Sequence, residues 1–161
     1  MRGSGKNTVA KILAQRLNLK LVDTDRLIEE EAEKSISDII KDKGLNAFRN
    51  LETKILSGVK KINNACLATG GGIIEKKYNK KLLSRLGFII YLRITPELAF
   101  KRIGNDPNRP LLTDETNMLQ DLKKLYLKRK PVYEKLARLT INCDNKNNDL
   151  IINEIINKIR L

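Results

Sequence analysis

The sequence contains no histidine and no tryptophan, and it has only two cysteines, Cys66 and Cys143. Without histidine, histidine-based acid–base and nucleophilic catalysis are excluded, and two isolated cysteines argue against a zinc site. Aromatic residues make up 4% of the chain while hydrophobic residues make up 41%, so the core must be aliphatic. Any chemistry therefore depends on Asp, Glu, Lys, Arg and backbone groups.

Long apolar runs are also missing. No stretch approaches the length of a membrane span, and no basic start, apolar stretch and small-residue cleavage site marks a signal peptide. We therefore expect a cytoplasmic protein with no membrane partner. The 161 residues are enough to bury a substantial core, and we expect a single domain over residues 1–161 that is a monomer.

Acidic residues are scarce relative to basic ones, 19 against 32, which gives a net charge of +13. One interpretation is nucleic-acid binding. The basic residues are dispersed, however, and few aromatic side chains are available to stack on bases. We favour lysines that solvate helix faces, which is compatible with attraction of anionic small molecules, and we expect no nucleic-acid partner.

Hydrophobic patterning predicts strands that alternate with helices. Short strands are predicted at 19–25, 65–72, 87–94 and 139–143, and helices at 6–17, 45–62, 79–86, 96–104, 117–136 and 149–160. A further helix is predicted to begin at Ser35, which resembles a capping box with Asp38, and to stop at Gly44. This alternation predicts an α/β fold with a parallel sheet covered on both faces. The polar, Gly- and Pro-punctuated segment 104–116 is long enough to be a lid.

The chain begins MRGSGKNT, and Gly3-Ser4-Gly5-Lys6 stands directly before a predicted helix. This is the pattern of the second half of a Walker A loop, in which backbone N–H groups surround phosphate oxygens and the lysine reaches the β/γ-phosphates. The tetrapeptide alone is a weak signal because a chance glycine turn has the same form. Its position at the start of a helix in an α/β chain strengthens the prediction.

Two carboxylates, Asp23 and Asp25, follow a predicted strand. Ligands bind at the carboxyl edge of a parallel sheet, so one carboxylate can serve a magnesium ion and the other can accept a hydrogen bond from a substrate hydroxyl. The alternative is a pair of N-cap residues for the next helix, since Asp is a favoured cap.

Arginines and glycines complete the candidate site. Phe48-Arg49 with Glu52 precedes the segment Gly70-Gly71-Gly72, whose lack of side chains permits close approach of a ligand to the backbone. Arg109 lies in the predicted lid, and Arg129 stands before a Pro-x-Tyr sequence. Arginines at such positions, in a chain with a phosphate loop, are typical of clamps for phosphate and carboxylate groups.

The ordered set GSGKNT, DTD, FRNLE, ATGGG, RPLL and RKPVY resembles shikimate kinase along almost the whole chain. The resemblance implies ATP-dependent phosphorylation of shikimate in chorismate biosynthesis. It also implies a P-loop, three-layer α/β/α fold with a five-stranded parallel sheet, a substrate-binding helical region at about 25–60 and a lid at about 104–116.

The resemblance also implies roles for individual residues. ATP would contact Gly3, Ser4, Gly5, Lys6, Asn7, Thr8, Arg102, Arg109 and Lys146, the last in the 144–148 turn. Shikimate would contact Asp25, Arg49, Gly70, Gly71, Gly72 and Arg129, with Glu52 orienting an arginine. Asn7 and Asp23 would serve Mg²⁺, while Lys6, Asp25 and Arg109 would be catalytic. Phosphoryl transfer requires positioning and charge neutralisation, which this inventory supplies without histidine.

The chain departs from the family pattern in two ways. The strand and first glycine that precede G-x-G-K in the family, the strand being central in its sheet, are absent before Gly3, so we expect the natural start to lie upstream. Asn7 replaces the family's Ser or Thr, and Thr8, which lies about 100° further around the helix, cannot substitute for it. We expect weaker use of magnesium. Alternatives are a degenerate or truncated non-catalytic nucleotide-binding protein and another small-molecule kinase of the same fold.

Overall fold

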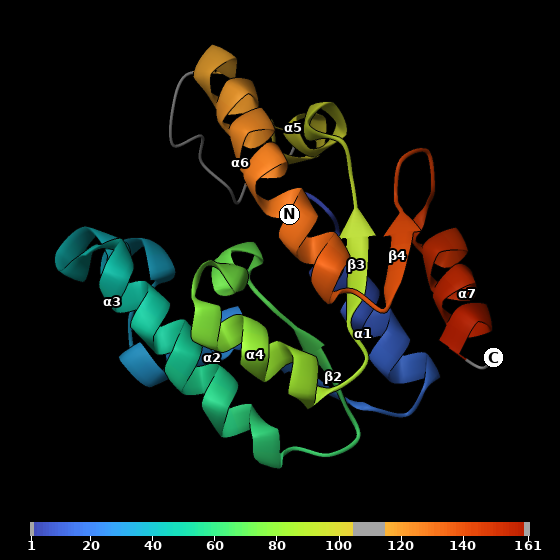
Figure 1. Cartoon of the computed structure of the whole chain (residues 1–161), viewed down its shortest axis with the longest axis horizontal. Helices are drawn as coiled ribbons and strands as arrows, with labels where there is room; N and C mark the ends of the chain where they lie inside the picture. Colours follow the sequence, from blue (N-terminus) through green and yellow to red (C-terminus); the bar gives the residue numbers. More distant parts are fainter. Residues whose placement is uncertain (1, 105–114, 160–161) are drawn as a thin grey trace. The chain divides into compact units, whose positions relative to one another are not determined.

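A computed structural model of the chain describes residues 2–104 and 115–159, with the side chains of 118–159 in the second range. The chain divides into two compact units (Figure 1). Unit 1 comprises the residues up to Val9 together with those from Phe88 onward, and unit 2 runs from Ala10 to Gly87. The single domain expected from the sequence stays a prediction.

Unit 2 contains a parallel pair of strands, β1 (Lys20–Asp23) and β2 (Ala65–Ala68). Its helices are α2 (Thr24–Ala32), α3 (Ile36–Gly58) and α4 (Lys77–Leu86), with the 3₁₀ turns η1 (Val59–Lys61) and η2 (Gly71–Glu75). Asp23 is in register with Ala68, so both strands end at the same edge. The start of α2 and the glycine segment therefore emerge side by side.

Local capping fixes where α2 and α3 begin. The side chain of Asp23 accepts a hydrogen bond from the backbone N–H of Asp25 at 3.0 Å and caps α2. Ser35 caps α3, accepting a hydrogen bond from the N–H of Asp38 at 3.1 Å while its hydroxyl donates to the Asp38 carboxylate at 2.6 Å. The capping interaction predicted from the Ser35 and Asp38 pair is thus confirmed.

The core of unit 2 is aliphatic, apart from Phe48. Ile28 of α2 packs with Ile39 and Phe48 of α3, and all three are almost completely buried. Each fully buried side chain of this size stabilises the fold by about 1.5–3 kcal/mol. This packing ties α2 to α3, the helix that carries Arg49 and Glu52.

Unit 1 contains a second parallel pair, β3 (Ile90–Arg93) and β4 (Leu139–Asn142), which lie side by side in Figure 1. Its helices are α5 (Pro96–Gly104), α6 (Glu115–Leu136) and α7 (Asn148–Ile159), together with the start of α1 (Lys6–Arg16). Proline occupies the first position of α5, where its missing N–H costs nothing. Ile103 of α5 packs with Met118 and Leu122 of α6 in an apolar cluster.

The structure refines the predicted sheet. Strand pairing is parallel as expected, but the described residues form two separate two-stranded sheets, β1 with β2 and β3 with β4. Gly44 ends a helical segment as predicted: its backbone is non-helical (φ 78°, ψ 165°), and a second segment, which shares the label α3, begins beyond this kink. The strand predicted over 65–72 ends at Ala68, because its partner β1 ends at Asp23, and the glycines enter η2.

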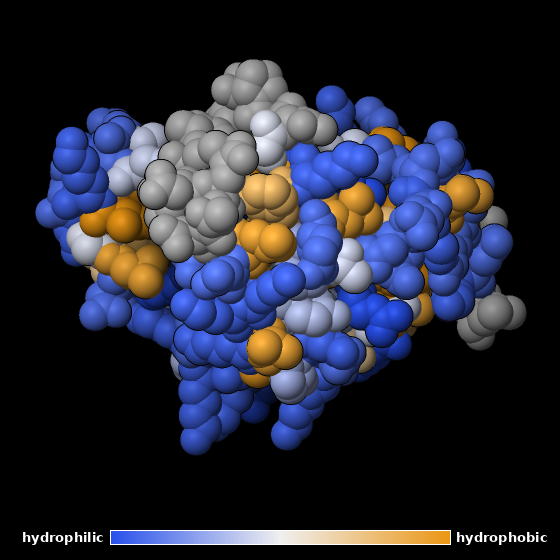
Figure 2. Space-filling model, turned by 90° about the horizontal axis from the view of Figure 1, so that it is seen from above, coloured by the Kyte–Doolittle hydropathy of each residue, from blue (hydrophilic) through white to orange (hydrophobic). Residues whose placement is uncertain are grey.

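On the face shown in Figure 2, hydrophilic side chains dominate and apolar side chains form small scattered spots. This distribution fits lysines that solvate helix faces. None of the helices in the described ranges has the length and hydrophobicity needed to cross a lipid bilayer.

Candidate functional site

The glycines before α1 form a turn that leads directly into the helix. Gly3 (φ 74°) and Gly5 (φ 75°) are left-handed, and Ser4 between them is 2% exposed. A Cβ on Gly3 would lie 2.8 Å from the backbone oxygen of Ala99, so only glycine fits. The N–H of Val9 donates to the carbonyl of Gly5 at 2.9 Å, which starts the helix. The N–H groups and the dipole at this helix start favour an anion.

Residues of α5 and of the 144–148 turn lie near this loop. A Cβ built on Gly5 lies 3.9 Å from the Asn148 side chain, at the start of α7. The Asp144 carboxylate accepts a hydrogen bond from the N–H of Thr95 at 3.1 Å, which ties the 144–148 turn to the start of α5. On α5, Arg102 donates weakly to the carbonyl of Cys143 at 3.5 Å. The structure therefore brings the loop, α5 and the turn together.

Three other predicted residues of unit 1 lie on or next to the helices α1, α6 and α7. Lys146 is ion-paired with Glu154 of α7, and this contact together with Lys158 lowers the pKa of Glu154. Arg129 lies on α6 and is half-buried. Asn7 lies exposed in the first turn of α1. Arg109 and most of the predicted lid fall outside the described residues.

In unit 2 the two aspartates have different surroundings. Asp23 caps α2, so the alternative N-cap interpretation holds for this residue. Asp25 instead faces the glycine segment: a Cβ built on Gly70 would lie 2.7 Å from Asp25 Oδ1 and 3.2 Å from Glu52 Oε1. A side chain at position 70 would collide with the carboxylate, so glycine is required there for the carboxylate to approach the backbone.

Arg49 lies against the same glycine segment. Its Nη1 donates to Glu52 Oε2 at 2.7 Å, with the side chains 14% and 1% exposed. Its guanidinium also lies 5.1 Å from the centre of the Phe48 ring, within cation–π range. A Cβ on Gly72 would lie only 2.2 Å from Arg49 Nη2. The turn at residues 70–73, called the glycine turn below, therefore has a carboxylate beside Gly70 and a guanidinium beside Gly72.

Sequence reasoning missed one buried polar residue near this turn, Asn79. It lies on α4, is completely buried, and its Nδ2 donates to the carbonyl of Ile73 at 3.0 Å. The signal was available: positions 79, 82, 83 and 86 form one helix face, and the other three are leucines. A single asparagine in an apolar stripe marks a side chain with a specific partner.

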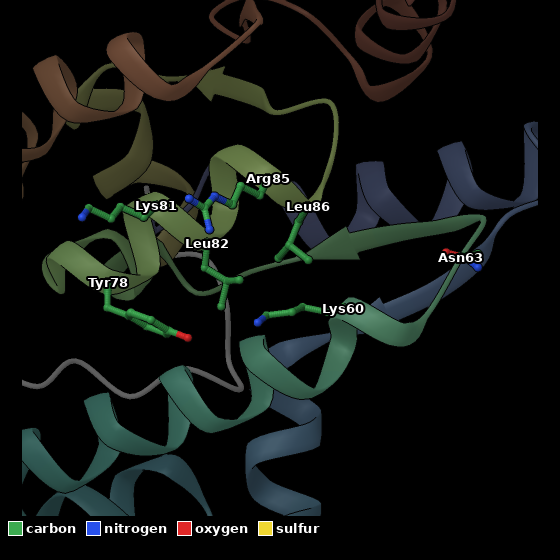
Figure 3. A pocket seen from close by; sticks show the side chains of 7 residues that line it. All are labelled: Lys60, Asn63, Tyr78, Lys81, Leu82, Arg85 and Leu86. Carbon is green, nitrogen blue, oxygen red and sulfur yellow. The ribbon is translucent and has the colours of Figure 1, made fainter.

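A surface pocket of about 410 Å³ in unit 2 does not coincide with these residues. In Figure 3 the side chains of Lys60, Tyr78 and Leu82 point toward one another, and Lys81 and Arg85 add two further cations to the lining. None of its lining residues belongs to the predicted site. The arrangement of Asp25, Arg49 and the glycine turn, not this pocket, therefore carries the functional assignment.

The described residues contain no group of three or more His, Cys, Asp or Glu side chains that could hold a metal ion. Mg²⁺ does not require such a group, because it is commonly held by one or two protein oxygens together with substrate phosphates. Asn7 and Asp23 carry oxygen donors of the kind that Mg²⁺ prefers, so the donor chemistry fits this ion.

Comparison with known proteins identifies the family. A family model described as shikimate kinase matches residues 2–160. The shikimate kinase of Haemophilus influenzae (strain PittEE) is 38% identical over 157 residues, which cover 98% of this chain and 87% of that protein. That of Sulfurihydrogenibium sp. (strain YO3AOP1) is 39% identical over 158 residues, with coverages of 98% and 93%. The solved structure of shikimate kinase from Acinetobacter baumannii in complex with shikimate superimposes with a TM-score of 0.91 at 34% identity, covering 98% of this chain and 88% of that one. The chain belongs to the shikimate kinase family.

Proposed function

We propose that this chain transfers the γ-phosphoryl group of ATP to a hydroxyl of shikimate, as a cytoplasmic monomer. The observation that carries the proposal is the glycine turn of unit 2, with Asp25 beside Gly70 and Arg49 beside Gly72. A substrate that bears a carboxylate and several ring hydroxyls needs a cation for the former and hydrogen-bond acceptors and donors for the latter. This turn offers both.

On the substrate side, Arg49 and Arg129 bind the carboxylate of shikimate. Gly70, Gly71 and Gly72 provide backbone contacts to the ring hydroxyls. Asp25 accepts a hydrogen bond from the attacking hydroxyl and holds its proton during transfer. Holding the carboxylate at one end decides which hydroxyl faces the phosphate, and correct orientation accounts for a large share of the rate enhancement.

On the nucleotide side, the backbone of Gly3–Thr8 surrounds the phosphates and Lys6 reaches the β/γ-phosphates. Arg102 and Lys146 contact the nucleotide. Arg109 closes over ATP from the lid, which excludes water and suppresses futile hydrolysis. Together Lys6 and Arg109 neutralise the charge that spreads over the γ-phosphoryl oxygens.

Magnesium is the metal that this chemistry implies. Asn7 offers an amide oxygen in the first turn of α1, and Asp23 offers a carboxylate at the end of β1. When bound, Mg²⁺ neutralises phosphate charge. The Asn7 side chain is longer than that of Ser or Thr and aims its oxygen differently, so we propose that magnesium is used but bound more weakly than in members with Ser or Thr at this position.

The test is ADP release from ATP, measured with and without shikimate. Release that depends on shikimate and falls at least about 100-fold in Asp25→Asn supports the proposal. Binding of ATP without turnover would identify a degenerate nucleotide-binding protein. Turnover with a different small hydroxylated acid would identify another kinase of this fold. Salt-sensitive binding of RNA or DNA without turnover would overturn the proposal.

A further inference from the structure

The glycine turn is anchored from the side of α4 by a single residue. Asn79 is completely buried, and its Nδ2 donates to the carbonyl of Ile73 at 3.0 Å. The N–H of Ile73 in turn donates to the carbonyl of Gly70 at 3.2 Å, which closes the turn. Ile73 therefore takes part in both interactions. Its carbonyl accepts a hydrogen bond from Asn79, and its N–H donates one to Gly70, where the glycine segment begins.

The opposite side of the turn leaves little space for movement. Gly70 lies against Asp25, and Gly72 lies so close to the Arg49 guanidinium that even a methyl group would collide with it. Ile73 and Ile74, which follow, are 2% and 5% exposed and are packed into the core. The backbone of Gly71 and Gly72 is therefore placed by three constraints: the two charged side chains, the apolar packing and the Asn79 amide.

The Asn79 amide is not explained by packing alone. Its Oδ1 is buried and, among the described residues, has no hydrogen-bond partner. A buried acceptor without a partner costs about 1–3 kcal/mol, whereas leucine has the same branched skeleton and no polar atom that needs a partner. A side chain that is unfavourable for packing yet makes one hydrogen bond to the turn is typical of a positioning residue.

We infer that Asn79 is a positioning residue for shikimate binding, which acts by holding the Gly71–Gly72 backbone in register with Asp25 and Arg49. The inference rests on the proposed function. Displacing a binding group by about 1 Å can cost about 100-fold in rate. Loss of the hydrogen bond from Asn79 is therefore expected to raise KM for shikimate and to leave KM for ATP unchanged.

The experiment compares Asn79→Leu with Leu82→Ala, which alters another buried residue (6% exposed) of the same helix. In Asn79→Leu we expect KM for shikimate to rise about tenfold or more, KM for ATP to change less than about twofold, and the Ile73 amide to exchange with solvent faster. In Leu82→Ala we expect the melting temperature to fall while KM for shikimate stays near the wild-type value.

Two results would overturn the inference: an unchanged KM for shikimate in Asn79→Leu, or an equal rise in Leu82→Ala at a temperature where both variants are folded. Turnover of the wild-type protein shows whether the inference about Asn79 or the proposed function itself has failed. If the wild type shows no shikimate-dependent turnover, the proposed function is wrong. The amide exchange of Ile73 still reports whether Asn79 holds the turn.

Discussion

Glu52 is a carboxylate with 1% of its side chain exposed, and its Oε2 accepts a hydrogen bond from Arg49 at 2.7 Å. Removing one partner of a buried ion pair leaves the other charge uncompensated, which is why such changes are costly. Because the same guanidinium lies against Gly72, the position of Glu52 determines how Arg49 presents its remaining N–H groups to the glycine turn. We therefore expect stability and substrate binding to be coupled at this residue.

We expect Glu52→Gln to lower the free energy of unfolding by about 1–3 kcal/mol, because the amide keeps a hydrogen bond but not the charge. KM for shikimate should rise about tenfold while KM for ATP is unchanged. Urea unfolding and steady-state kinetics measure both. The control is Glu31→Gln, which breaks the exposed pair with Lys54 and should change neither quantity appreciably. Unaltered shikimate kinetics in Glu52→Gln would contradict this role.

Asn7 occupies an exposed position in the first turn of α1. If its amide oxygen is a weak magnesium ligand, Asn7→Ser should lower the magnesium concentration for half-maximal activity by about threefold or more, and Asn7→Ala should raise it. A magnesium titration of turnover at saturating ATP measures both variants. Identical magnesium dependence in wild type and Asn7→Ser would show that the side chain does not serve the metal.

Cys143 is completely buried, its thiol lies 3.6 Å from the carbonyl of Ile141, and burial raises its pKa to about 11 from 9.0. The unfolded chain therefore loses this proton at lower pH than the folded chain. Stability falls as pH rises from about 9 to about 11, at about 1.4 kcal/mol per pH unit from this group. Cys143→Ala should reduce that slope, as measured by urea unfolding across this pH range under reducing conditions. Parallel curves for the two proteins would contradict the assignment.

At the scale of elements, Gly44 decides how α3 is built. Its backbone angles, φ 78° and ψ 165°, lie in a region that is accessible almost only to glycine. The kink separates the capped first half of α3 from the second half, which carries Arg49 and Glu52. Since nothing lies within 4 Å of a Cβ built at this position, any cost of a side chain there comes from the backbone and not from a collision.

Gly44→Ala should therefore lower the free energy of unfolding by about 1–3 kcal/mol. Gly58 is the matched control, because it lies in the same helix, has helical angles (φ −69°, ψ −38°) and also has open space around it. Gly58→Ala should raise stability by about 0.4–1 kcal/mol, since alanine restricts the unfolded chain. Urea unfolding of both variants tests the pair. Stabilisation by both substitutions would show that α3 straightens without cost.

At the scale of elements, the end of a helix or strand can be predicted from the sequence where nearby residues set it. It cannot be predicted where pairing with a distant strand sets it. Ser35 with Asp38, and Pro96 at the first position of α5, are local signals, and the structure begins helices at these points. The end of β2 at Ala68 is not local, because it is set by register with β1. The same distinction applies to the site. The glycine turn with Arg49 and Glu52 is expected from the motifs that the chain shares with the family. The sequence marks Asn79 only as a polar residue in an apolar helix face, and its partner, the carbonyl of Ile73, is known only from the structure.

At the scale of the whole molecule, the net charge of +13 sets a balance between solubility and self-repulsion. Several lysines are compensated by nearby carboxylates, as Lys34 is by Asp42 at 2.8 Å. The pocket in Figure 3 differs, because Lys60, Lys81 and Arg85 all line it without a carboxylate among the lining residues. Repulsion between such groups is strongest at low ionic strength, where the Debye length is about 30 Å instead of about 8 Å and the charges are screened less.

We therefore expect the melting temperature to rise as sodium chloride increases from about 0.01 M to about 0.15 M. Lys81→Gln should raise the low-salt melting temperature and reduce this dependence, because it removes one of three neighbouring cations. Lys34→Gln removes the same charge from the molecule but also removes the attraction to Asp42, so it should not stabilise the protein at low salt. Thermal unfolding of the three proteins across the salt series separates local repulsion from total charge. If both variants raise the melting temperature equally, total charge alone governs the effect; if neither does, the repulsion at this pocket is negligible.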